Sequence, residues 1–222
     1  VTSVVMGNCG FALAPCKPEA REWYARCLEA VEDIPTEAML KGIDWTWETF
    51  PEYLETVERL PKAINYGAYI GHSALRMYAM GERALTEAAT EDDLEAMEAA
   101  VTEALEAGAM GFSTSRSTTH ITPDGTPVAS RIADWEEVDR LAGAMRAAGA
   151  GIFQIGPDVS GGAAQRAFLD RLLQVALAKA RFDPNAMDDS LARYRRVLEQ
   201  TPDAQPHARA WLLHEIGTER WF

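Results

Sequence analysis

Four short apolar segments alternate with longer helical patterns over the first 155 residues, and this alternation constrains the fold more than any other feature. The apolar segments cover residues 2–6, 63–70, 109–115 and 151–155. Strands that alternate with crossover helices build a parallel sheet. We therefore predict an α/β fold for this part of the chain. From residue 163 onward the periodicity is helical (163–180, 188–200 and 206–216), which predicts a helical C-terminal segment.

Capping residues place the helices between these strands. Pro18 marks the start of a helix that runs to about residue 31, and an aromatic-rich segment precedes another that ends near Leu60. Thr90 is a good N-cap for a long helix that Gly108 ends. Asp134 caps a further helix to about residue 148, and a short helix is expected over residues 74–80.

Composition excludes several function classes. The chain has 21 basic and 34 acidic side chains, a net charge of −13, which argues against a nucleic-acid partner. It contains no apolar run of membrane-spanning length, and its N-terminus lacks signal-peptide features. The three cysteines do not form a disulfide framework. We therefore expect a soluble, cytoplasmic protein without a membrane partner. It lacks a P-loop, a dinucleotide fingerprint and a serine-hydrolase elbow.

Polar residues follow the predicted strands where ligands meet parallel α/β folds, at the carboxyl ends of the strands. Cys9 follows the first strand between two glycines. Its thiolate could bind zinc or act as a nucleophile. The alternative is a small buried residue at a turn, which is a frequent role of free cysteine.

Three further residues are candidates for substrate binding. His72 follows the second strand, where it could be a ligand, an acid–base group or a residue that hydrogen-bonds loops together. Arg116 and His120 lie on the polar loop after the third strand and could hold a carboxylate. The alternative for these two residues is a solvated loop tied by its own hydrogen bonds.

Several ordered segments resemble the N-acyl-D-amino-acid deacylases (D-aminoacylases) of the amidohydrolase superfamily. The similarity covers about residues 1–158, and its clearest segments are VVMGNCGFALAPC (residues 4–16), WTWETFPEYL (45–54), GHSALR (71–76) and AGAMGFSTSR (107–116).

This resemblance implies a zinc-bearing (β/α) TIM-like barrel that hydrolyses an acyl amide bond with a metal-activated water. A zinc ion polarises the carbonyl group and lowers the pKa of its bound water. Carried over to this chain, Cys9 is the metal ligand. His72, Arg116 and His120 are the candidate substrate-binding residues, although the motif around His72 does not supply a metal histidine in the family. The substrate would be a small acyl amino acid.

The chain departs from the family pattern in its metal-binding histidines. The expected early His-x-His or His-x-Asp strand is absent, and Gln154 stands where a Thr-His motif is expected. We therefore predict a partial barrel over residues 1–158 and a helical annex over 159–222, in a chain that is a fragment of a longer enzyme. The alternative is a catalytically inactive scaffold or interaction module. An oligomer, or the missing half of the barrel, would cover the apolar surface that a partial barrel exposes.

Overall fold

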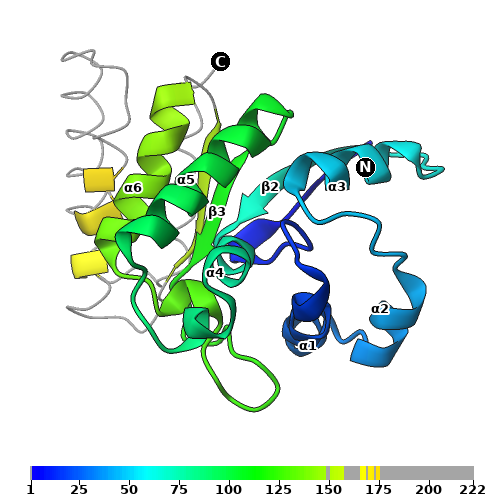
Figure 1. The fold of residues 1–222 in the computed structure, drawn as a ribbon, viewed down its shortest axis with the longest axis horizontal. Helices are drawn as coiled ribbons and strands as arrows, with labels where there is room; N and C mark the ends of the chain where they lie inside the picture. The colour runs from blue at the N-terminus through cyan, green and yellow to red at the C-terminus, as the bar shows by residue number, and fades with distance from the viewer. Residues whose placement is uncertain (1, 149–150, 158–165, 169, 173, 176–222) are drawn as a thin grey trace, which may run out of the picture. The chain divides into compact units, whose positions relative to one another are not determined.

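The computed structural model describes residues 2–148, 151–157, 166–168, 170–172 and 174–175 (Figure 1). The chain divides into two compact units, Val1–Gly156 and Pro157–Phe222. The described residues of the second unit from 166 onward are helical, as expected for a helix over 163–180. The two later predicted helices, 188–200 and 206–216, lie outside the described residues. The predicted domain boundaries stay a prediction.

The first unit alternates strands and helices as the sequence predicts. Its main elements, in order, are β1 (Ser3–Met6), α1 (Arg21–Glu32), α2 (Thr36–Gly42), α3 (Phe50–Arg59), β2 (Asn65–Gly71), α4 (His72–Met80), α5 (Glu91–Glu106), β3 (Gly111–Ser115), α6 (Trp135–Ala148) and β4 (Ile152–Gly156).

Within the described residues, the four strands form one parallel sheet in the order β1-β2-β3-β4. Each strand lies beside the next one along the chain, which is the order found in the wall of a (β/α) barrel. A doubly wound sheet would instead reverse its strand order part-way. The described strands therefore fit the predicted partial barrel.

The predicted caps form the expected hydrogen bonds. The Thr90 hydroxyl accepts from the backbone N–H of Asp93, whose carboxylate accepts in return from the Thr90 backbone. The Asp134 carboxylate accepts from the backbone N–H of Glu137 at 2.8 Å. Two expectations need correction. Helix α2 was not predicted, and α4 begins at His72 rather than at residue 74.

The hydrophobic core includes a layer between the sheet and the helices α4, α5 and α6, and it extends to side chains of α1 and α3. Helix α5 lies beside α6, and both α4 and α6 contact β3 (Figure 1). Phe112 of β3 is fully buried, and its ring stacks on Phe153 of β4. Burying a side chain of this size stabilises the fold by about 1.5–3 kcal/mol. The other fully buried large apolar side chains of these elements are Ile70, Leu75, Met97, Val101, Val138 and Leu141.

Candidate functional site

The turn after β1 places Cys9 at the carboxyl end of the sheet. Gly7 adopts φ +80°, and a β-carbon at this position would lie 2.5 Å from the carbonyl oxygen of Tyr69, so the chain needs glycine here. The Ser113 hydroxyl ties the turn to β3, because it donates to the Gly7 carbonyl and accepts from the Gly10 N–H. Cys9 itself has φ 56°, in the left-handed region.

Gln154 of β4 clamps Cys9 through both ends of its side-chain amide. Its Oε1 accepts from the Cys9 backbone N–H at 2.7 Å, and its Nε2 donates to Cys9 Sγ at 3.7 Å. In the sequence, Gln154 stands out only as a departure from the family pattern. The sequence did contain a signal for this role, because Gln154 is the one polar residue in the apolar segment 152–155. A buried amide needs a hydrogen-bond partner.

Ser115 and His120 lie beside Cys9. A β-carbon on Gly156 would be 3.1 Å from Ser115 Oγ and 3.2 Å from Cys9 Sγ, so these two side chains pack closely against the glycine. His120 Nδ1 lies 2.6 Å from Ser115 Oγ. The rings of His120 and Phe11 make a T-shaped contact. Burial of the half-exposed imidazole, together with the charge of Arg131, lowers the pKa of His120.

His72 is placed differently, because it is fully buried and both ring nitrogens have protein partners. Nδ1 lies 2.7 Å from Thr114 Oγ1, and Nε2 lies 2.6 Å from Glu137 Oε1. Glu137 also accepts from Arg76, another fully buried side chain. Burial lowers the pKa of His72. This geometry favours the alternative in which His72 connects structural elements, and its predicted contact with substrate is untested.

Arg116 is held by the loop that follows its own strand. Its guanidinium donates to the backbone carbonyls of Ala133 and Asp134 and stacks over the Trp135 ring at 4.9 Å. Burial lowers the pKa of Arg116. Two of the guanidinium nitrogens of Arg116 therefore already donate hydrogen bonds to the protein backbone. The structure therefore favours the self-tied loop for Arg116, and its predicted role toward substrate is also untested.

The described residues do not form a zinc site on their own. They contain no cluster of three or more His, Cys, Asp or Glu side chains that could hold a metal ion. A catalytic zinc takes about three protein ligands. Cys9 is the residue that the family resemblance names as a metal ligand, and its side-chain hydrogen bond is to the Gln154 amide. His207 and His214 lie outside the described residues.

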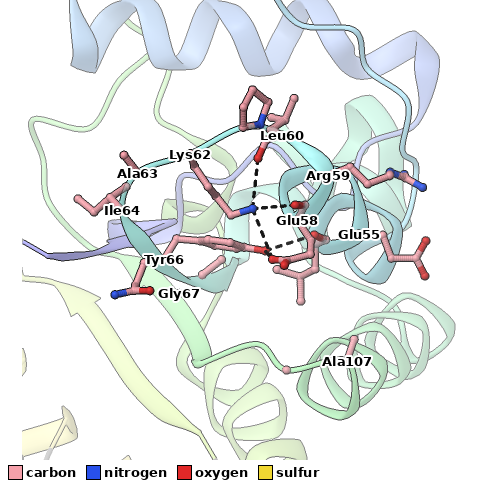
Figure 2. A pocket seen from close by; sticks show the side chains of 15 residues that line it. Glu55, Glu58, Arg59, Leu60, Lys62, Ala63, Ile64, Tyr66, Gly67 and Ala107 are labelled. Carbon is pink, nitrogen blue, oxygen red and sulfur yellow. Dashed lines mark hydrogen bonds and ion pairs between the residues drawn. The ribbon is translucent and has the colours of Figure 1, made fainter.

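A groove of about 1120 Å³ lies beside the first residues of β2, whereas Cys9 lies at the carboxyl end of the sheet. Figure 2 shows the residues that line this groove. Its polar groups largely satisfy one another. Lys62 donates to three backbone carbonyls near the end of α3 and pairs with the Glu58 carboxylate, which also accepts from the Tyr66 hydroxyl. The residues that line the groove are 54–55, 58–68 and 107–108. This arrangement caps a helix and brings no reactive groups together.

The sequence matches the amidohydrolase family over residues 1–214. The chain belongs to this family. It is 35% identical to a D-aminoacylase of Alcaligenes xylosoxydans xylosoxydans over 114 residues, which cover 51% of this chain and 21% of that protein. It is also 35% identical to an N-acyl-D-glutamate deacylase of the same organism over 150 residues, 68% of this chain and 26% of that protein. The predicted resemblance to D-aminoacylases is confirmed.

Solved structures agree with the predicted fold class. A crystal structure of D-aminoacylase matches 79% of this chain and 32% of its own, with 27% identity and a TM-score of 0.58. An N-acyl-D-glutamate deacylase of Bordetella bronchiseptica, complexed with zinc and a phosphonate inhibitor, has the same fold over 81% of this chain, with a TM-score of 0.59 and 24% identity. The partial barrel is thereby confirmed. The chain spans about a third or less of the length of these relatives.

Among the described residues, no helix is both long enough and apolar enough to cross a membrane.

Proposed function

We propose that this amidohydrolase hydrolyses the amide bond of N-acyl-D-amino acids, with Cys9 at the centre of its site. The observation that carries the proposal is the turn of residues 7–10. It presents Cys9 at the carboxyl end of a parallel sheet, in a chain whose relatives include a D-aminoacylase and an N-acyl-D-glutamate deacylase. This is the edge at which barrel enzymes gather their catalytic residues.

The chain's own residues give the Cys9 side chain a fixed position. Gln154 and Ser113 hold the turn from β4 and β3, and Cys9 Sγ packs close to Gly156, where a β-carbon would lie only 3.2 Å from it. A preorganised side chain loses little entropy when it engages a ligand. We infer that Cys9 contributes one ligand to a zinc ion in the active protein, and that further ligands lie beyond the described residues.

Four finer assignments accompany this proposal. We infer that the described strands belong to a complete TIM-like barrel in the active protein. The substrate is a small acyl amino acid. The protein acts in the cytoplasm, and either an oligomer or further barrel strands cover its exposed apolar surface.

The test is metal-dependent release of free amino acid from N-acetyl-D-glutamate, N-acetyl-D-leucine and their L-enantiomers. The purified chain is assayed with added zinc, and its zinc content is measured by elemental analysis. We expect release from the D-enantiomers, and we expect Cys9→Ala to abolish this release and lower the zinc content. Cys27→Ala removes a buried thiol of α1 and serves as the matched control. Equal release by the Cys9→Ala variant, or no release by the wild-type chain, would contradict the proposal.

A further inference from the structure

His120 differs from His72 and Arg116 because one of its polar atoms remains free to contact a ligand. Its Nδ1 is used by Ser115. Its Nε2 has no hydrogen-bond partner in the part of the chain that the structure describes. The imidazole is half-buried and makes a T-shaped contact with the Phe11 ring, so its orientation is restricted while one nitrogen stays available.

Ser115 determines which nitrogen of His120 carries the proton. The Ser115 hydroxyl is fully buried and accepts from the backbone N–H of Ser117 at 3.1 Å. A buried hydroxyl proton needs an acceptor, and His120 Nδ1 is the acceptor within reach at 2.6 Å. Nδ1 therefore accepts, and the neutral ring carries its proton on Nε2. The lowered pKa of His120 is consistent with a neutral ring at pH 7.

The loop of residues 116–131 holds His120 in place and brings a positive charge to it. The carbonyl of His120 accepts from the Val128 N–H and from the guanidinium of Arg131. Ile121 pairs with Pro127 in an isolated bridge. The chain as a whole carries a net charge of −13, which repels anions. The Arg131 guanidinium, which contacts the backbone of His120, is therefore the local positive charge that would favour an anionic oxygen there.

We infer that His120, oriented by Ser115, recognises the carboxylate of the acyl amino acid by donating a hydrogen bond from Nε2. This inference rests on the proposed function for its substrate class. Ser115 acts here as a positioning residue, because it sets the tautomer and does not itself reach the ligand. Cys9 Sγ and Ser115 Oγ both pack against Gly156, and Ser115 contacts His120, so a carboxylate on His120 would place the rest of the molecule near Cys9.

The first test compares an acid with its neutral amide as ligands. N-acetyl-D-alanine and N-acetyl-D-alaninamide are titrated into the wild-type chain and its variants by calorimetry. A hydrogen bond to a charged group corresponds to about tenfold in affinity or more, so we expect the acid to bind at least about tenfold tighter than the amide. His120→Phe keeps a ring against Phe11 without the donor and should remove this preference. His120→Gln keeps a side-chain N–H donor and should retain part of it.

Ile121→Ala is the matched control, because it shortens an exposed side chain of the same loop. It should leave the preference for the acid unchanged. An unchanged preference in His120→Phe, or no preference in the wild-type chain, would overturn the inference. Neither result decides the proposed function, which is judged separately by release of D-amino acids.

The second test observes the tautomer directly. Long-range proton–nitrogen NMR spectra report which nitrogen of each imidazole is protonated. We expect the Nε2–H form for His120 in the wild-type chain, and a mixture of tautomers in Ser115→Ala. The Nδ1–H form in the wild-type chain would overturn the inference independently of any ligand.

Discussion

At the scale of single residues, the buried triad of His72, Arg76 and Glu137 makes the sharpest stability prediction. Glu137→Ala would leave the Arg76 guanidinium buried without its ionic partner. Removing one member of a buried pair costs roughly 3–5 kcal/mol of the free energy of unfolding. We expect this loss in urea denaturation. Glu91→Gln is the control, because it breaks an exposed ion pair with Arg140. It should lower the free energy of unfolding much less than Glu137→Ala does. Similar losses in both variants would contradict the buried network.

The same triad predicts a pH dependence of stability. Burial lowers the pKa of His72 below its ordinary value of 6.5, and the pKa of Glu137 is lowered as well, because hydrogen bonds and charges from His72 and Arg76 outweigh its desolvation. Below about pH 6.5 the unfolded chain therefore binds a proton at His72 that the folded chain binds less readily, so stability falls on acidification. Glu137 adds a further loss as the pH falls through its own lowered pKa.

This dependence is measured as the free energy of unfolding in urea between pH 7.5 and pH 5. We expect it to decrease as the pH falls, and we expect a smaller decrease in His72→Gln. His207→Gln is the control, because it also removes one titrating imidazole from the chain. It should leave the decrease as large as in the wild-type chain. An equal slope in His72→Gln and the wild-type chain would show that His72 is not the group responsible.

At the scale of elements, the turn between β1 and Cys9 depends on glycine for two separable reasons. Gly7→Ala introduces both a positive φ at a residue with a β-carbon and a close approach to the Tyr69 carbonyl. Gly125→Ala introduces a similar φ, +85°, with open space around the β-carbon. The left-handed conformation alone costs about 1–2 kcal/mol. We therefore expect a larger loss of unfolding free energy for Gly7→Ala than for Gly125→Ala. Equal losses would contradict the close packing of this turn.

At the scale of the whole molecule, the sheet has two edges without a neighbouring strand among the described residues, β1 and β4. Val4, Val5 and Ile152 on these strands are each more than a third exposed. Exposed apolar edge strands favour association with other chains, and a charged residue on the edge opposes it. We expect the chain to self-associate with rising concentration in sedimentation velocity, and Val5→Lys to reduce this association. A wild-type chain that stays monomeric at high concentration would contradict the prediction.

Much of the fold could be predicted because its signals are local. Thr90 and Asp134 cap helices through hydrogen bonds that span three residues, and alternating apolar segments need no distant partner to be recognised. Helix α2 was missed because it is short, and its propensity signal is correspondingly weak. The contacts within the candidate site were harder to predict from the sequence. Cys9, His72, Arg116 and His120 were correctly placed after the strands, but the partners of Cys9 and His72 lie far away in the sequence.

The sequence by itself determined the α/β alternation, the family and the presence of polar residues after each strand, because periodicity, caps and ordered motifs are written in neighbouring residues. Only the tertiary structure decided how those polar residues are used. It joined Gln154 to Cys9 across 145 positions and His72 to Glu137 across 65, and it left His120 with one free ring nitrogen. The physical reason is that a hydrogen bond depends on which atoms the fold brings within about 3 Å, and the distance along the chain does not determine this.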